Sequence, residues 1–213
     1  DLVHVTQGGT DPSFGVVLNA PIGDTVALRF AGSWQHKPGL IDIDNPSYHK
    51  EHADEGYTRT GRIMGLWQPT DKFTLNAWYI RGQRNANDLD YVTNSNGQFT
   101  RDDSTAPSPV ENGYSLATLD ARYAFDWATL VSISAYQTKN SFNQADASDL
   151  VEPLAELGVR TLTSVRQVNT SGYQQELRLV SPNDGPWTWL TGAYISTYKA
   201  NIDSSLNLYP GLT

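Results

Sequence analysis

Residues Thr25–Gln35, with the sequence TVALRFAGSWQ, carry the clearest structural signal in this chain. Apolar or small residues occupy every second position from Val26 through Phe30 to Trp34, whereas Arg29 belongs to the opposite set. Because successive side chains of a β-strand point to opposite faces, the pattern predicts a strand with one apolar and one polar side. Such a strand fits between lipid and water, and it also fits between the core and the solvent of a soluble sheet.

The same pattern recurs along the chain. Eight strands are predicted, at Ser13–Ala20, Thr25–Gln35, Thr58–Gln68, Phe73–Gly82, Tyr114–Phe125, Thr129–Thr138, Tyr173–Val180 and Trp187–Lys199. Very short turns within pairs of strands alternate with long polar segments, at roughly His36–Tyr57, Arg84–Gly113 and Lys139–Gly172. Long loops are unusual inside a compact soluble domain, but this alternation is typical of outer-membrane barrels. We therefore expect an all-β fold, an antiparallel up-and-down transmembrane β-barrel, of which this chain supplies about eight strands.

Composition narrows the function classes. The chain has 213 residues, no cysteine and a net charge of -8. The absence of cysteine excludes disulfides and thiolate metal sites, and the acidic balance argues against nucleic acid as a partner. Mean hydropathy is -0.46 and no apolar run is long enough for a membrane helix, which a barrel does not need. Because the chain starts at Asp1 without a signal peptide and stops at Thr213 after a strand-like run, we expect it to be a fragment or a processed piece of a longer protein.

Aromatic residues gather near the ends of the predicted strands. The tryptophans concerned are Trp34, Trp67, Trp127, Trp187 and Trp189. Amphipathic rings favour the boundary between membrane and water, so these positions predict aromatic girdles. Edge aromatics on a soluble sheet are the alternative. Two pairs of charged residues, Asp120 with Arg122 and Glu176 with Arg178, fall on inward faces, where we expect them to pair across strands.

The first two long segments hold the candidate ligand-contacting residues. The first segment carries a His-x-x-His motif with flanking carboxylates, which suits a transition metal, whereas a solvated acidic loop is the plain alternative. The second is dense in amide and carboxylate groups near a tyrosine, which suits sugars or calcium, or simple hydration. The candidates are Trp34, His36, Asp42, Asp44, His49, His52, Asp88, Asp90, Tyr91 and Arg101. Whether any metal binds stays open.

The sequence offers no constellation for catalysis. No Gly-x-Ser-x-Gly elbow and no phosphate-cradling glycine loop is present. We therefore expect no enzyme activity and no cofactor. In the third long segment, the sequence of residues Ser148–Leu157 is compatible with a short helix.

An ordered series of phrases resembles a known family. They are VLNAPIGDTVALRFAGSWQHKPG (Val17–Gly39), LWQPTDKFTL (Leu66–Leu75), ATLVSISAY (Ala128–Tyr136), QELRLVSP (Gln175–Pro182) and WLTGAY (Trp189–Tyr194). Together they resemble the barrel of TonB-dependent outer-membrane receptors of the siderophore-receptor-like group. The resemblance implies a barrel of about 22 strands with an N-terminal plug. Here the plug, the TonB-contacting segment and the closing strand are missing, so residues 1–213 are expected to be a partial barrel.

The resemblance also implies a function. It would be TonB-driven uptake, across the bacterial outer membrane, of a large scarce solute such as a ferric siderophore, cobalamin or a saccharide. The expected partners are that solute, outer-membrane lipid, and TonB through the missing N-terminal region. Two alternatives are a soluble β-sandwich that binds carbohydrate and an autonomous eight-stranded barrel with an adhesive or structural role.

Overall fold

A computed structural model shows that the chain is almost entirely β-strand. It describes residues 2–5, 9–93, 98–150, 158–182 and 186–210. The long strands are β2 (Gly9–Ile22), β3 (Val26–Lys37), β6 (Gly56–Thr70), β7 (Phe73–Ala86), β9 (Val110–Ala124), β10 (Thr129–Asp146), β11 (Val159–Val180) and β12 (Leu190–Pro210). The short ones are β1 (Leu2–Val5), β4 (Asp42–Asn45), β5 (Tyr48–Lys50) and β8 (Thr100–Arg101). No helix in the described part of the chain is long and apolar enough to cross a membrane.

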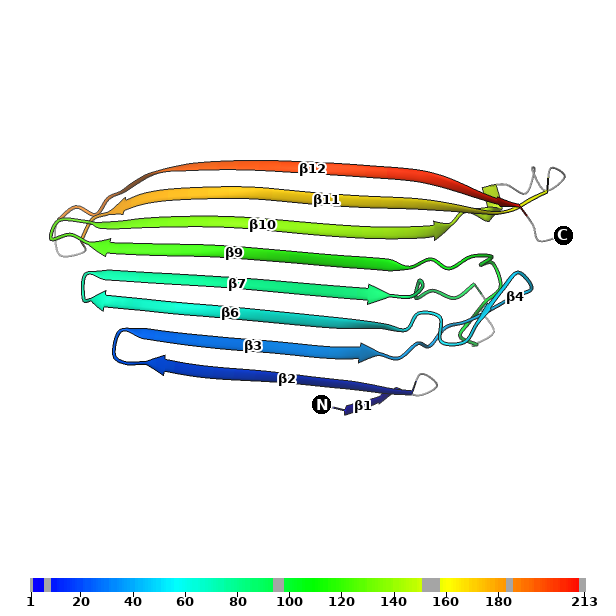
Figure 1. Cartoon of the computed structure of the whole chain (residues 1–213). Helices are drawn as coiled ribbons and strands as arrows, with labels where there is room; N and C mark the ends of the chain where they lie inside the picture. Colours follow the sequence, from blue (N-terminus) through cyan, green and yellow to red (C-terminus); the bar gives the residue numbers. More distant parts are fainter. Residues whose placement is uncertain (1, 6–8, 94–97, 151–157, 183–185, 211–213) are drawn as a thin grey trace.

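The long strands form one antiparallel sheet. Its order, β1-β2-β3-β6-β7-β9-β10-β11-β12, follows the chain, so each long strand pairs with the next one in an up-and-down arrangement (Figure 1). This confirms the predicted fold class. Within the described residues β1 pairs only with β2 and β12 only with β11, so the sheet is not closed and an autonomous closed barrel is not observed.

Short turns and long connections lie at opposite ends of the sheet. The turns after β2, β6, β9 and β11 lie together at the left of Figure 1, and the longer connections lie at the right. We call these the turn end and the loop end. Each predicted strand exists, although β12 begins at Leu190, three residues later than expected.

The prediction of a third long loop, at Lys139–Gly172, is wrong. Most of Lys139–Gly172 is strand, because β10 and β11 stay paired from Thr129↔Val180 to Asp146↔Thr163. The polar run NSFNQ (140–144) hides this extension, since backbone pairing needs no apolar face once a strand leaves its apolar surroundings. Of the expected helix at Ser148–Leu157, residues 148–150 form a single 3₁₀ turn, and 151–157 lie outside the described residues.

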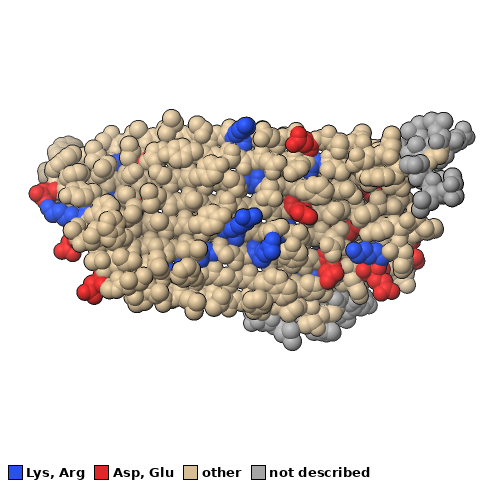
Figure 2. Space-filling model, viewed as in Figure 1, with Lys and Arg blue, Asp and Glu red and all other residues tan. Residues whose placement is uncertain are grey.

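The pairing register separates two faces of the sheet. One ladder row runs Leu28↔Gly65↔Ala77↔Leu119 and another runs Phe30↔Ile63↔Tyr79↔Ala117. Paired residues project from the same face, so these rows define an apolar face. Three successive rows, from Ile22↔Val26 to Leu18↔Phe30 and across to β12, contain no charged residue. In Figure 2, almost the whole surface is uncharged between the charged turn tips and a group of Lys and Arg near the middle.

The opposite face carries the charged residues of the middle of the sheet, and we call it the charged face. It contains Arg29, Arg62, Asp120, Arg122, Glu176 and Arg178. Arg122 Nη2 donates to Asp120 Oδ2 at 2.9 Å, and Arg178 Nη2 donates to Glu176 Oε2 at 2.6 Å. Both pairs therefore form along one strand, two residues apart, and the expectation that they pair across strands is wrong.

Strand β10 departs from the expected sidedness. Its apolar residue Ile133 pairs with Asp120 and with Glu176, so it lies on the charged face. Ser134 lies on the apolar face and donates to Gln175 Oε1, which satisfies both polar groups there. The neighbouring ladders, rather than the polarity of β10 itself, fix which side each residue takes.

Aromatic rings form a band at the turn end. Trp67 contacts Phe73 with ring centroids 5.6 Å apart. A second run continues from Tyr123 to Phe125 at 4.7 Å, to Trp127 at 5.9 Å and to Trp189 at 6.4 Å. The predicted clustering of tryptophans at strand ends is thus observed for these residues.

No second layer covers the apolar face in the described part of the chain. The second sheet, β5-β4-β8, has three short strands at the loop end. Large apolar side chains in mid-strand remain open, including Ile63 at 50% and Leu119 at 44% exposure. The described buried apolar residues are Ile41, Ile43, Ala53, Ala106, Ala128 and Leu162. A β-sandwich would bury the mid-strand residues instead, so this alternative is not favoured.

Two glycines of β6 give a test of the ladder. A Cβ on Gly56 would lie 2.2 Å from the carbonyl oxygen of Asn85, whereas a Cβ on Gly61 would have nothing within 4 Å. We expect Gly56→Ala to lower the free energy of unfolding by about 1–3 kcal/mol. Gly61→Ala should leave it unchanged or raise it by roughly 0.5 kcal/mol. Denaturant unfolding followed by tryptophan fluorescence measures both, and equal effects would contradict this register.

Candidate functional site at the loop end

A small sheet joins the first two loops at the loop end. β4 from the first loop pairs with β5 in antiparallel fashion and with β8 of the second loop in parallel fashion. Ile43 in β4 and Ala53 just beyond β5 are fully buried. The Asp42 amide donates to the carbonyl of Phe99 at 2.9 Å. The two loops therefore form one folded unit above the main sheet.

A buried ion pair fixes the second loop. Arg101 and Asp88 are both 1% exposed, and Arg101 Nη1 lies 2.9 Å from Asp88 Oδ1. The same carboxylate accepts the amides of Leu89 at 2.8 Å and Ser108 at 3.0 Å. Arg101 also donates to Ser104 and lies 4.2 Å from the ring centroid of Tyr91. Two predicted ligand-contacting residues, Asp88 and Arg101, thus lie inside the loop and hold it together.

Asp54 has the same task in the first loop. Its Oδ1 accepts the amides of Leu40 at 2.6 Å and Ile41 at 2.7 Å. Its Oδ2 lies 3.3 Å from Lys37 Nζ, which also lies 3.5 Å from Asp90 Oδ2. Lys37 therefore connects the end of β3 to both loops.

Asp146 joins the second loop to β10. Its carboxylate accepts the amides of Thr105 and Ala106, the latter at 3.0 Å, and the amide of Ser148 at 3.0 Å. By accepting these hydrogen bonds, the Asp146 carboxylate pairs loop amides that would otherwise be buried without a partner.

The histidines are separated rather than gathered. His36 Nε2 lies 2.7 Å from Glu55 Oε1, and His49 Nδ1 lies 3.4 Å from Asp44 Oδ1. The His52 amide donates to Asp42 at 2.8 Å, and His52 has a φ of 51°. In the described part of the chain no three His, Asp or Glu side chains gather as metal ligands do.

Trp34 and His36 lie on the apolar face. Phe14, Trp34 and His36 follow one another there, with centroid distances of 5.5 Å and 6.2 Å. Asp44, His49, His52 and Asp90 are exposed on the loops, whereas Asp42 is half-buried and Tyr91 is only partly covered. This partial burial raises the pKa of the Tyr91 phenol above its usual value, and the Arg101 cation opposes the shift. The phenol is therefore protonated at neutral pH, and it donates to Asp103 at 3.3 Å.

A hollow of about 210 Å³ opens on the charged face beneath the loops. Lys37, Arg84 and Asn112 reach it from β3, β7 and β9, and Asp90 reaches it from the second loop. Within the described residues no carboxylate lies within ion-pair distance of Arg84. The arrangement offers a guanidinium, an amide and a partly neutralised ammonium to an anionic or hydrogen-bonding solute.

The ligand-contacting residues predicted from the sequence do not include Lys37, Arg84 or Asn112. A signal was available, because Lys37 continues the Arg29, Ser33, Gln35 alternation and Arg84 continues the Trp78, Ile80 one. Both strands run past the predicted boundary with unchanged parity, which places these residues on the charged face.

Comparisons with known proteins support the fold. No family model matches the sequence, and no curated protein matches it either. The solved structure of the ferric yersiniabactin uptake receptor FyuA from Yersinia pestis is similar, with a TM-score of 0.70 and 17% sequence identity. The match covers 93% of this chain and 30% of that receptor, so the chain spans less than a third of its length. At this identity the likeness shows the fold alone, an antiparallel sheet that matches a β-barrel wall.

The ion pair between Asp88 and Arg101 predicts a local loss of stability on substitution. Asp88→Ala leaves a buried guanidinium without its carboxylate, which typically costs about 3–5 kcal/mol. We expect faster hydrogen exchange at the amides of Leu89 and Ser108, because in the wild-type protein both amides donate to the Asp88 carboxylate. Asp90→Ala is the control, because Asp90 is in the same loop and its side chain is 71% exposed. If both variants exchange like the wild type, the pair does not hold the loop.

Proposed function

We propose that the chain forms part of the wall of an outer-membrane barrel and that the protein takes up a large anionic solute such as a ferric siderophore. The observation that carries the membrane assignment is the apolar face, with three successive uncharged rows across all the long strands. Lipid is the environment that covers such a face without a second protein layer. The charged face then lines a water-filled interior.

The limit of the apolar face runs obliquely across the sheet. On β2 and β3 it reaches Phe14 and Trp34, on β7 it ends at Tyr79 and on β12 at Ile195. Beyond it lie Arg59, Arg81 and Lys199 on the same face. An oblique limit is expected when strands cross the bilayer at a tilt of roughly 35–45°. The strands continue past this limit, and β11 and β12 extend furthest toward the loop end.

The transport assignment rests on the barrel likeness and the loop-end hollow together. FyuA is named as a receptor for uptake of a ferric siderophore. We propose a related role here, driven by TonB, with residues 1–213 as a partial barrel and with no chemistry performed on the solute. Arg84 favours an anionic chelate as cargo, since a guanidinium binds carboxylate or phenolate oxygens by charge-assisted hydrogen bonds, whereas Lys37 is already paired with Asp54 and Asp90. Asp90 and Tyr91 stay candidates for further contacts at the rim of this hollow.

Adjacent positions on β9 test the membrane assignment. Leu119 projects from the apolar face and Thr118 from the charged face. Leu119→Arg places a cation in lipid, which we expect to destabilise the barrel by about 2–4 kcal/mol and to lower its amount in outer-membrane fractions. Thr118→Arg should assemble normally. If the protein is recovered in the soluble fraction, or if the two variants assemble alike, the membrane assignment fails.

Uptake of radioactive iron tests the solute assignment. Cells expressing the protein would be given a ferric catecholate, a ferric hydroxamate or a ferric carboxylate. For a transported anionic chelate we expect Arg84→Gln to raise the apparent KM about tenfold, because one charge-assisted hydrogen bond is lost. Lys72→Gln is the control, since Lys72 lies in a solvent-exposed ion pair with Asp126 at the turn end. Uptake no greater than in cells without the protein, for every chelate, would contradict a siderophore-like cargo.

A further inference from the structure

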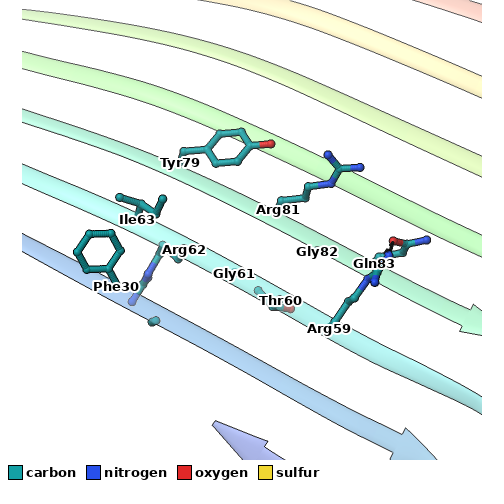
Figure 3. Close-up of a pocket in the computed structure, with 11 residues that line it drawn as sticks. Phe30, Arg59, Thr60, Gly61, Arg62, Ile63, Tyr79, Arg81, Gly82 and Gln83 are labelled. Carbon is teal, nitrogen blue, oxygen red and sulfur yellow. Dashed lines mark hydrogen bonds between the residues drawn. The ribbon is translucent and has the colours of Figure 1, made fainter. Parts of the chain in front are cut away.

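The apolar face has a hollow of about 520 Å³ over the middle of β6 (Figure 3). Its floor is Gly61. Phe30, Ile63 and Tyr79 border it toward the turn end, and Arg59, Arg81 and Gln83 border it toward the loop end. One border is therefore apolar and the other carries two guanidinium groups.

Gly61, which lines this hollow, pairs with a second glycine. Gly32 of β3 and Gly61 of β6 are direct partners on the apolar face, so two neighbouring side chains are missing from one row. Neither glycine is required by packing. A Cβ on Gly61 would have nothing within 4 Å, and one on Gly32 would make only ordinary contacts at 3.8 Å and 4.0 Å. Glycine weakens a strand interior, and an unforced glycine there often marks the close approach of a ligand.

The two arginines are available to an anion. Arg59 donates from Nε to Gln83 Oε1 at 3.1 Å and lies 5.7 Å from the ring centroid of Tyr57, but neither contact neutralises it. In the described part of the chain no carboxylate lies within ion-pair distance of Arg59 or Arg81. Because Gly61 pairs with Arg81 and Arg59 pairs with Gln83, the two cations are diagonal neighbours on adjacent strands. Their backbones are therefore roughly 5–8 Å apart, so that one multivalent anion can contact both.

We infer that this hollow binds one phosphorylated lipid from the outer leaflet of the surrounding membrane. The acyl chain lies over Gly61 against Phe30, Ile63 and Tyr79, and the phosphate oxygens accept hydrogen bonds from Arg59 and Arg81. This inference rests on the proposed function, since it requires the apolar face to meet lipid. The hollow lies where that face changes from apolar to basic, which is the depth at which a lipid changes from acyl chain to headgroup.

Charge and shape together favour this occupant. A guanidinium binds phosphate through two parallel donors, and two guanidiniums match a phosphate better than they match a zwitterionic or neutral headgroup. Long basic side chains also reach toward the interface without binding any particular lipid. Binding of one lipid in the hollow differs from general attraction to the interface, because only the former needs the space over Gly61.

Native mass spectrometry of the protein, purified from outer membranes in mild detergent, tests the inference. The probes are dimyristoyl phosphatidic acid, dimyristoyl glycerol and inorganic phosphate. We expect one tightly bound phosphatidic acid, and weaker binding of the other two probes. Arg59→Gln and Arg81→Gln should each weaken phosphatidic acid binding about tenfold, since each removes charge-assisted hydrogen bonds. Gly61→Leu should weaken it similarly, because its Cβ has open space within 4 Å and the side chain then occupies the hollow.

Arg29→Gln is the matched control, since it removes a cation from β3 on the charged face. It should bind phosphatidic acid like the wild type. Phosphatidic acid binding by Gly61→Leu at wild-type affinity, or unchanged binding by both arginine variants, overturns the site. Inorganic phosphate binding as tightly as the lipid overturns the lipid as the source of the phosphate. Recovery of the protein from outer membranes shows beforehand that a failure concerns this site and not the membrane assignment.

Discussion

The antiparallel ladder of backbone hydrogen bonds is the constraint on which the rest of this structure depends. In hydrocarbon no water pairs with an exposed amide or carbonyl, so a spanning sheet must satisfy these groups between strands. The ladder also fixes the side on which each residue projects, because a slip of one residue exchanges the two faces. In β10 this effect is visible, since Ile133 lies between Asp120 and Glu176 although its own strand would permit the opposite face. Sidedness is thus a property of the sheet as a whole.

The buried side chains are distributed in a way that would not stabilise this sheet in water. The buried apolar side chains that the structure describes belong to the loops and the sheet ends. In mid-strand, by contrast, Leu18 is 59% exposed and Ile63 is 50% exposed. At roughly 25 cal/mol per Å² of apolar area, covering the apolar face is the largest stabilisation open to this chain. In lipid that face is covered by acyl chains, and the ladder and the ion pairs of the charged face supply the specificity. In the proposed membrane, the aromatic band from Tyr123 to Trp189 would lie where acyl chains give way to water at the turn end.

The strands and turns could be predicted because they depend on local parity and turn chemistry. Val26, Phe30 and Trp34 share a face in the structure as they do in the pattern. The outer halves of β10 and β11 could not be predicted in this way, since Asn140 and Asn169 pair on one face and Lys139 and Thr170 on the other, and both faces are polar. The burial of individual loop residues could not be predicted from the sequence either. Asp88 lies two residues from the exposed Asp90 in a similar polar sequence, and only the folding of the two loops onto each other buries the pair of Asp88 and Arg101.

The buried polar contacts of the loop end explain how such long connections keep a fixed shape. Asp88, Asp54 and Asp146 each accept two or more backbone amides, so three carboxylates supplement the small apolar core of the loops around Ile43 and Ala53. The acidic residues therefore divide into two groups, because those that hold the loops are withdrawn from solvent while Asp44 and Asp90 stay exposed. Screening limits an exposed charge to about 8 Å at physiological ionic strength. A solute that reaches Arg84 on the charged face is consequently governed by the charges around that hollow, and the net charge of -8 on the whole chain has little influence there.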